Sequence, residues 1–339
     1  MLHTIYITSP IISEKSYNNI YNNLKIISKN RGYNLYKESE NLYLTNAFAD
    51  LGIKEVRLRK TKIARKYNYY NKQIEMLVNP KRLIEKKNKI DITKAEDIEE
   101  ISKEFNKIMQ SISTDLPSFF NFTIQRIDYC INIETEYVEE YIKLFQRADR
   151  PSIYFKELYD NKTHRRGQRQ GSFYLKSNSV NINFYNKEEE RLNNNILDNN
   201  SKNILRLEVQ CKKEKTNNIK FKKQFRTKNL LYFFNKDLSR EIIEYYYKKT
   251  VGKEDYYKLN KAIELIKASK NSETMKEKMI TVLKEVNKKR SVVIARQESI
   301  YNKANFNRYL KKIRTLNINV VTIPESWKIN KLENLLTNL

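Results

Sequence analysis

The spacing of apolar residues changes near residue 227, and this change sets the main limit on how the chain can fold. Before it, several segments alternate apolar and polar residues as half-buried strands do, for example Ile74, Met76 and Val78. After it, apolar residues recur every three to four positions in segments 238–248, 256–268, 274–287 and 304–316, which is the spacing of amphipathic helices. The pattern predicts an α+β fold with a central antiparallel sheet and flanking helices, followed by a mainly helical C-terminal region.

The same pattern predicts the order of elements and two domains. We place the boundary between residues 228 and 229, so that residues 1–228 form the α+β domain and residues 229–339 the helical one. Helices are expected at 13–29, 93–109 and 135–146, the second capped by Asp91 or Thr93. Strands are expected at 3–12, 42–47, 54–59, 72–78, 122–133, 171–176, 180–187 and 204–211.

Charge points to a polyanionic partner. The chain has 66 Lys and Arg against 40 Asp and Glu, a formal net charge of +26. Nucleic acid fits such an excess, because each cation placed on a phosphate releases condensed counterions. A Lys- and Asn-rich composition inherited from an AT-rich genome is the alternative, and it implies no partner. A membrane surface would call for a basic amphipathic helix or a lipidation motif, and the sequence has neither.

The scarcity of certain residues excludes several chemistries. Two histidines, His3 and His164, cannot build a histidine-rich zinc site or a plausible Ser-His-Asp triad, and five glycines do not form a phosphate-binding loop. Cys130 and Cys211 lie in apolar strand-like runs and are expected to be buried thiols in a reducing compartment. We find no apolar run of ~20 residues and no signal peptide, so we expect a cytoplasmic protein without a membrane partner.

Charged residues within predicted strands form the candidate active site. Arg126 with Asp128, Tyr185 with Lys187, and Arg206 with Glu208 are each two residues apart, so each pair points to one face of the sheet. If the strands are neighbours, Asp128 and Glu208 make an oxygen-ligand site suited to Mg²⁺ or Mn²⁺. Tyr185 would be the nucleophile, and the cations Arg126, Lys187 and Arg206 would stabilise negative charge on the reacting phosphate.

A second interpretation treats these residues as ordinary solvent-facing side chains of amphipathic strands, in cross-strand pairs worth ~0.2–1 kcal/mol each. Further DNA contacts are expected from Arg165, Arg166 and Arg169, which cluster in a predicted loop, and from Lys176 on the strand that follows. A solvated loop is the competing explanation for the three arginines.

The order of the short motifs resembles the replication initiation factor family, which includes initiator proteins of rolling-circle plasmids and phages and related relaxases. The motifs are Arg126-Ile-Asp128-Tyr-Cys-Ile-Asn132, Gly171-Ser-Phe-Tyr-Leu-Lys-Ser177, Asn183-Phe-Tyr185-Asn-Lys187 and Arg206-Leu-Glu208-Val-Gln. The resemblance spans roughly residues 90–215. It implies metal-dependent, site-specific nicking and rejoining of one DNA strand by a tyrosine that becomes linked to the cut 5′ end.

Matched position by position, the resemblance puts Asp128 and Glu208 on the acidic positions, and Tyr185 and Lys187 on the Tyr-x-Lys segment. The chain departs from the family at two positions: Asn132 stands where relatives often have a second acid, and Glu189 stands where plasmid members often have a second tyrosine. If that second tyrosine is the nucleophile in relatives, this chain lacks it, and Tyr174 is the fallback.

The resemblance implies a replication initiator of a plasmid or mobile element, acting as a DNA nicking-closing endonuclease on its origin duplex and single strand. The exposed lysines of the helical C-terminal domain suggest that this domain helps to bind the duplex. A host helicase and a second copy of the chain are further candidate partners. The alternative is a sequence-specific DNA-binding initiator that recruits host replication proteins without cutting. A structural protein that is basic only through genome composition is the third reading.

Overall fold

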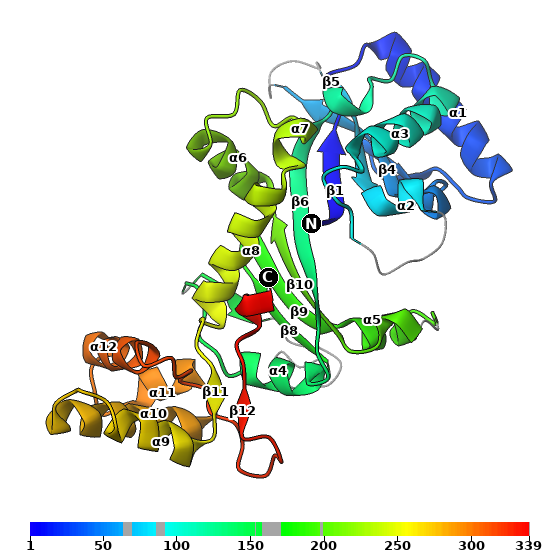
Figure 1. Cartoon of the computed structure of the whole chain (residues 1–339). Coiled ribbons are helices and arrows are strands. Elements are labelled where there is room, and N and C mark those ends of the chain that lie inside the picture. The colour runs from blue at the N-terminus through cyan, green and yellow to red at the C-terminus, as the bar shows by residue number, and fades with distance from the viewer. Residues whose placement is uncertain (64–69, 86–91, 153, 158–170, 197–198, 339) are drawn as a thin grey trace. The chain divides into compact units, whose positions relative to one another are not determined.

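The computed structural model describes residues 1–63, 70–85, 92–152, 154–157, 171–196 and 199–338 (Figure 1). By its internal contacts the chain divides into two compact units that are not consecutive in sequence. The first unit contains residues 1–131, 178–181 and 208–242, and the second contains residues 132–177, 182–207 and 243–339. Residues 229–242 thus belong to the first unit. The assignment of residues 229–339 to a separate DNA-binding domain stays a prediction.

The described residues form a ten-stranded sheet in the order β2-β3-β4-β5-β1-β6-β10-β9-β8-β7, flanked by helices (Figure 1). Neighbouring strands from β2 through β6 run antiparallel, and so do β7 and β8. The predicted fold class is confirmed. The strands are β1 (Leu2–Thr8), β2 (Tyr36–Ser39), β3 (Leu42–Thr45), β4 (Ile53–Lys62), β5 (Tyr70–Val78), β6 (Thr123–Glu134), β7 (Lys156–Glu157), β8 (Ser172–Lys176), β9 (Val180–Asn186) and β10 (Ile204–Cys211).

In the first unit, α1 (Glu14–Asn30), α2 (Pro80–Ile84) and α3 (Ile98–Ile112) pack with the strands and with one another. The helix α1 begins after Ser13, whose side chain accepts a hydrogen bond from the backbone of Ser16, and it buries Tyr17, Ile20 and Leu24. The helix α3 starts later than predicted: Thr93 instead forms a β-bridge with Leu2, and Asp97 is the residue that precedes the helix.

Two further helices of the first unit, α6 (Lys213–Lys222) and α7 (Leu230–Phe233), were not expected from the sequence. The short α7 begins at Asn229, whose side chain accepts a hydrogen bond from the backbone of Leu231. Cys130 in β6 and Cys211 in β10 are both buried, as predicted, and neither forms a disulfide. The helices α6 and α7 were missed because a short helix has too few residues to show the helical period, so its apolar residues resemble those of a strand.

The second unit has an aromatic core. Phe184 of β9 packs its ring 4.8 Å from that of Phe145, and Phe173 and Tyr247 complete the cluster. Four helices follow in the C-terminal region, with the small pair of strands β11 (Tyr256–Tyr257) and β12 (Lys331–Leu332). The helices of this unit are α4 (Val138–Phe145), α5 (Lys187–Asn193), α9 (Leu259–Lys267), α10 (Glu273–Lys289), α11 (Val292–Glu298) and α12 (Lys303–Arg314). The long helix α8 (Lys236–Thr250) has residues in both units.

One strand ends earlier than predicted. Lys187 is not in β9 but is the first residue of α5, where Asn186 caps the helix by accepting from the backbone nitrogens of Glu188 and Glu189. The expectation that Tyr185 and Lys187 alternate on one strand face is therefore wrong, because an Asn-capped helix start interrupts the alternation. Within the described part of the chain, no helix has the length and apolar character needed to cross a lipid bilayer.

Candidate functional site

One face of the sheet in the first unit carries polar and charged side chains, while the other is apolar. The register places Arg57 opposite Glu75 and Tyr6 opposite Arg126, and directly opposed residues of antiparallel strands share a face. We call this the polar sheet face. It comprises Thr4 and Tyr6 of β1, Glu55, Arg57 and Arg59 of β4, Gln73 and Glu75 of β5, Arg126 and Asp128 of β6, and Glu208 and Gln210 of β10.

The centre of this face is a buried ion pair. The side chain of Asp128 is 1% exposed, and Arg126 donates to both of its carboxylate oxygens, from Nε and from a terminal nitrogen, each at 3.0 Å. The hydroxyl of Thr4 donates to the same carboxylate, and Gln210 donates to it at 3.4 Å. A planar guanidinium that binds a carboxylate through two donors is among the strongest polar contacts in proteins.

Beside the ion pair, the imidazole of His3 lies 3.2 Å from Glu208. A β-bulge between Leu2 and Ile5 allows His3 and Thr4, which are consecutive, both to reach the polar sheet face. Burial raises the pKa of Asp128 above its usual value and the nearby Glu208 carboxylate adds to the rise, while the Arg126 guanidinium opposes it. Asp128 and Glu208 therefore lie close enough to interact, as their alternation in sequence suggested.

These residues fit an ion pair better than a metal centre. Carboxylate oxygens and an imidazole suit a divalent cation in principle, but Arg126 and Thr4 already occupy the oxygens of Asp128. Among the residues that the structure describes, no group of three or more His, Cys, Asp or Glu side chains is arranged to hold a metal ion. The binding of Mg²⁺ or Mn²⁺ by Asp128 and Glu208 stays a prediction.

A second cluster on the same face escaped the sequence analysis. The phenol of Tyr6 donates a 2.5 Å hydrogen bond to Glu75, and Arg59 donates to the other oxygen of that carboxylate at 2.8 Å. Burial raises the pKa of Tyr6 above its usual value, and Glu75 adds to the rise while Arg57 and Arg59 oppose it. The sequence did carry a signal, since Arg57 and Arg59 stand two apart within a predicted strand.

The predicted nucleophile belongs to the second unit. Tyr185 is 7% exposed, and the ammonium nitrogen of Lys187 lies 5.8 Å from the centre of its ring. Lys187 pairs with Glu190 at 2.5 Å, and its pKa is lowered by burial and by the nearby cation Arg206. Arg206 itself is buried and donates to Asn132 at 2.7 Å. The structure thus groups Tyr185, Lys187 and Arg206 within this unit.

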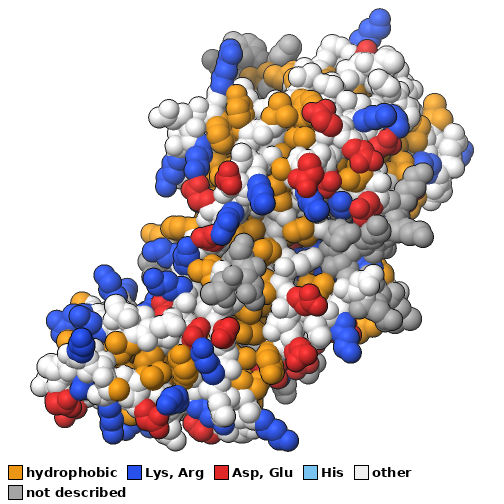
Figure 2. All heavy atoms as spheres, in the orientation of Figure 1, with side chains coloured by type: hydrophobic (Ala, Val, Ile, Leu, Met, Phe, Trp, Pro, Cys, Tyr) orange, Lys and Arg blue, Asp and Glu red, His pale blue; other side chains and the backbone are white. Residues whose placement is uncertain are grey.

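The remaining predicted DNA contacts fall in different places. Lys176 is exposed in β8 and stands opposite Lys156 of β7, whereas Arg165, Arg166 and Arg169 lie outside the described residues. On the face of the molecule in Figure 2, Lys and Arg side chains are spread among Asp and Glu and do not gather in a single patch. The net charge alone therefore does not locate a nucleic-acid site on that face.

Comparison with known proteins finds similarity to solved structures. No protein-family model and no curated protein matches the chain. A solved structure described as a rolling circle replication initiator protein from Geobacillus stearothermophilus aligns with 74% of this chain and 84% of its own, at 9% identity and a TM-score of 0.32. A similarity at this level supports no conclusion about activity, so the function must be argued from the residues of this chain.

Chemically, the arrangement combines anion-binding groups with groups that exchange protons. The polar sheet face presents guanidinium groups that are partly exposed, at 25% for Arg57, 37% for Arg59 and 28% for Arg126. Two tyrosines, Tyr6 and Tyr185, each lie beside a titratable side chain. Within the first unit, a phosphodiester held by these guanidinium groups could be attacked by the phenol of Tyr6.

Proposed function

We propose that this protein is a replication initiator that binds DNA and nicks one strand through a tyrosine. The observation that carries the proposal is the polar sheet face, where Arg126 and Asp128 form a buried ion pair beside Glu208. Charged residues buried within strands are costly, so their concentration on one face calls for a function. The net charge of +26 and the order of motifs along the chain support the same conclusion.

DNA binding is assigned to the arginines of the polar sheet face. Their guanidinium groups can each donate two hydrogen bonds to a phosphate, which suits a backbone that must be held in a fixed position. Because each neutralised phosphate releases counterions, affinity should fall steeply with salt. Substitution of Arg57 by Gln should weaken binding similarly for all sequences, since phosphate contacts carry no base information.

In the cutting step, Tyr185 acts as the nucleophile. The phenolic oxygen of Tyr185 attacks the scissile phosphorus, a bond forms between them, and the bond from phosphorus to the 3′ oxygen breaks. The phenol proton passes to the amine of Lys187, whose pKa is lowered by burial and by Arg206, which increases the share of neutral amine able to accept a proton. The departing 3′ oxygen takes a proton from water to become a hydroxyl, and Arg206 stabilises the charge on the phosphate during transfer.

Tyr6 is the alternative nucleophile. Its phenol already donates to Glu75, which could take the proton, and Arg59 lies against the same carboxylate. Tyr6 also stands opposite Arg126, so a phosphate bound there would lie near the phenol. Against this assignment, the raised pKa of Tyr6 makes its phenol harder to ionise.

The test uses supercoiled DNA that carries the gene with its flanking sequence, incubated with the full-length protein and then denatured. Relaxed circles together with a covalent protein–DNA adduct support the proposal. The variants Tyr185→Phe, Tyr6→Phe and Tyr174→Phe identify the tyrosine that forms the adduct, and Tyr36→Phe, at an exposed position of β2, is the matched control. A cut that survives in all three variants would contradict a tyrosine mechanism for these positions.

The same assay tests the metal prediction. Reactions with Mg²⁺, with Mn²⁺ and with a chelator are compared for wild type and for Glu208→Gln. Loss of nicking with the chelator, and a higher metal requirement in the variant, would support a divalent ion at Asp128 and Glu208. Equal nicking in all three conditions would refute it.

A second candidate function is DNA binding without cutting, in which the protein recruits host replication proteins. The observation that favours it is the engagement of Asp128 by Arg126 and Thr4, which leaves that carboxylate in a structural role. Unchanged DNA topology combined with tight, sequence-specific and salt-dependent binding would support this candidate. Affinity that does not change with salt would contradict both.

A further inference from the structure

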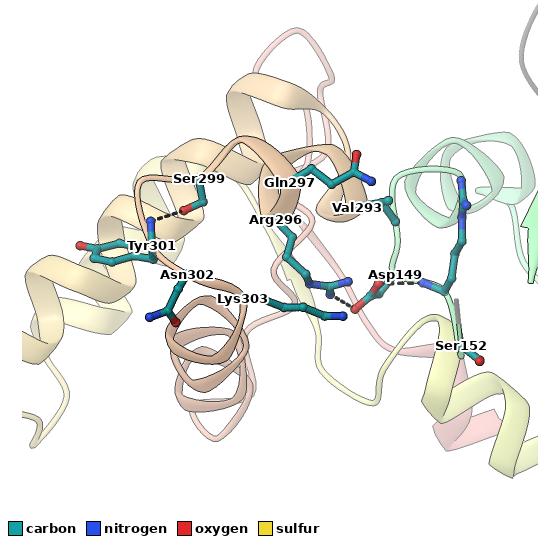
Figure 3. Close-up of a pocket in the computed structure, with 10 residues that line it drawn as sticks. Asp149, Ser152, Val293, Arg296, Gln297, Ser299, Tyr301, Asn302 and Lys303 are labelled. Atoms are coloured by element: carbon teal, nitrogen blue, oxygen red, sulfur yellow. Dashed lines mark hydrogen bonds and ion pairs between the residues drawn. The ribbon is translucent and has the colours of Figure 1, made fainter. Parts of the chain in front are cut away.

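A pocket of about 640 Å³ opens within the second unit, between the segment that follows α4 and the helices α11 and α12 (Figure 3). Its volume lies in the range of small-molecule sites. Three cations line it, Arg150, Arg296 and Lys303, against the single acid Asp149. Uncharged residues line the rest of the pocket, among them Tyr301, Gln297 and the apolar Val293. A cavity with this lining favours an anion that also has an uncharged part.

The acid in the pocket is already engaged. One oxygen of Asp149 accepts from the backbone nitrogen of Arg150 at 2.8 Å, and the other is paired with the guanidinium of Arg296, as the dashed lines in Figure 3 mark. The Nε–H of Arg296 is nevertheless buried and has no hydrogen-bond partner among the described residues. A buried donor without a partner carries a desolvation cost that a ligand oxygen would remove.

Lys303 adds a cation where a helix start disfavours one. It is the first residue of α12, and the first turn of that helix contains no acidic residue. The positive end of the helix dipole favours an anion at this place. In Figure 3 the Lys303 side chain reaches toward Arg296 and Asp149, and in the described structure Lys303 has no ion-pair partner. Lys303 and Arg296 thus converge on one point of the pocket.

Charge near the pocket is also uncompensated. The backbone of Arg147 accepts a hydrogen bond from Val292 at 3.0 Å, which ties the segment after α4 to α11. Burial lowers the pKa of Arg147, and the nearby Arg290 lowers it further. Neither arginine has an acidic partner among the described residues. An anion bound in this region would relieve their repulsion.

We propose that this pocket binds a nucleoside phosphate, with its phosphate held by Arg296 and Lys303. Inorganic phosphate would leave most of the volume empty, whereas a nucleoside fills it and can contact Tyr301 and Val293. The same chemistry could come from a free nucleotide or from one nucleotide unit of a DNA strand. The site lies in the second unit alone and does not depend on the nicking reaction.

The experiment measures binding of two probes to the full-length protein by fluorescence anisotropy: a deoxyadenosine triphosphate with a fluorescent label on its ribose, and a labelled short oligothymidylate. The variant Lys303→Gln removes the exposed cation of the pocket. The matched control Lys311→Gln removes the same charge from an exposed position of α12 that does not line the pocket. A third variant, Val293→Trp, fills the pocket without changing charge, and thermal melting verifies that each variant is folded.

We expect Lys303→Gln to weaken binding about tenfold, the effect of losing one charge-assisted hydrogen bond, and Val293→Trp to weaken it as well. If the pocket variants lose binding of the triphosphate, the ligand is a free nucleotide. If they lose binding of the oligothymidylate alone, the ligand is a unit of a DNA strand. Equal losses in Lys303→Gln and Lys311→Gln would overturn the proposal, because general electrostatics would then explain binding. Absence of binding by both probes at millimolar concentration would overturn it too.

Discussion

Replacing Asp128 by Asn tests whether the buried ion pair holds the polar sheet face together. The substitution keeps the shape of the side chain but removes its charge, and it turns one acceptor toward Arg126 into a donor. Asp128 is 1% exposed, and Arg126 binds it through two contacts of 3.0 Å. Breaking a buried pair by removing one partner costs about 3–5 kcal/mol.

We expect a loss near the low end, about 3 kcal/mol in the free energy of unfolding, because the side chain of Arg126 is 28% exposed and can recover water. Urea unfolding followed by circular dichroism measures the loss. Glu208→Gln is the matched control: it removes the carboxylate charge that lies 3.2 Å from His3, and it should cost less than about 1 kcal/mol.

A double-mutant cycle with Arg126→Gln separates the pair from the single side chains, and we expect a coupling energy above about 1 kcal/mol. A cost below about 1 kcal/mol for Asp128→Asn, or a coupling near zero, would refute the ion-pair reasoning. Stabilisation of wild type by Mn²⁺ that disappears in Asp128→Asn would instead identify Asp128 as a metal ligand.

Three further predictions concern stability. The pKa of Lys228 is lowered from 10.5 to about 8, first by burial and then by two nearby lysines, so the charged form of Lys228 destabilises the folded state below pH 8, and this destabilisation fades as pH rises toward 10.5. Lys228→Gln should therefore be more stable than wild type at pH 7. Thermal melts should show the difference in melting temperature shrinking at higher pH. Phe184→Ala should lower the free energy of unfolding by about 4 kcal/mol, because its ring is fully buried in the aromatic cluster; a loss like that of an exposed aromatic in urea unfolding would contradict the packing. Gly52 has φ +99° and an added Cβ would lie 2.8 Å from a backbone nitrogen, whereas Gly32 at φ +76° has open space. Gly52→Ala should thus cost more than about 1 kcal/mol and Gly32→Ala less, and equal shifts in melting temperature would show that backbone strain alone matters.

Much of the local structure could be predicted from the sequence. The helix at 13–29 is α1, and the strand at 204–211 is β10. Errors occurred where a specific contact, either within the segment or with a distant strand, overrides periodicity. Lys187 left its predicted strand because Asn186 caps a helix at that point, and Thr93 left its predicted helix because it pairs with Leu2. Neither contact is visible in the spacing of apolar residues.

The candidate site was only half predictable. Arg126 and Asp128 stand two apart in one strand, so their shared face follows from the geometry of any β-strand. Thr4, which binds the same carboxylate, is 124 residues away in sequence. Likewise, Glu75 is separated from Tyr6 by 69 residues. Register between strands distant in sequence depends on the whole sheet, and the spacing of residues within one segment contains no record of it.

The sequence by itself determined the alternation that separates an apolar from a polar sheet face, the helical character of the C-terminal region and the large positive charge. Each of these depends on residues close together along the chain, where the periods of helix and strand act directly. Tertiary structure alone decided which charges meet: it gave Asp128 its arginine, put Tyr6 beside Glu75, and assembled the pocket of Arg296 and Lys303. Such contacts arise only when distant segments are packed together, because a side chain a few ångströms long interacts with its spatial neighbours whatever their distance in sequence.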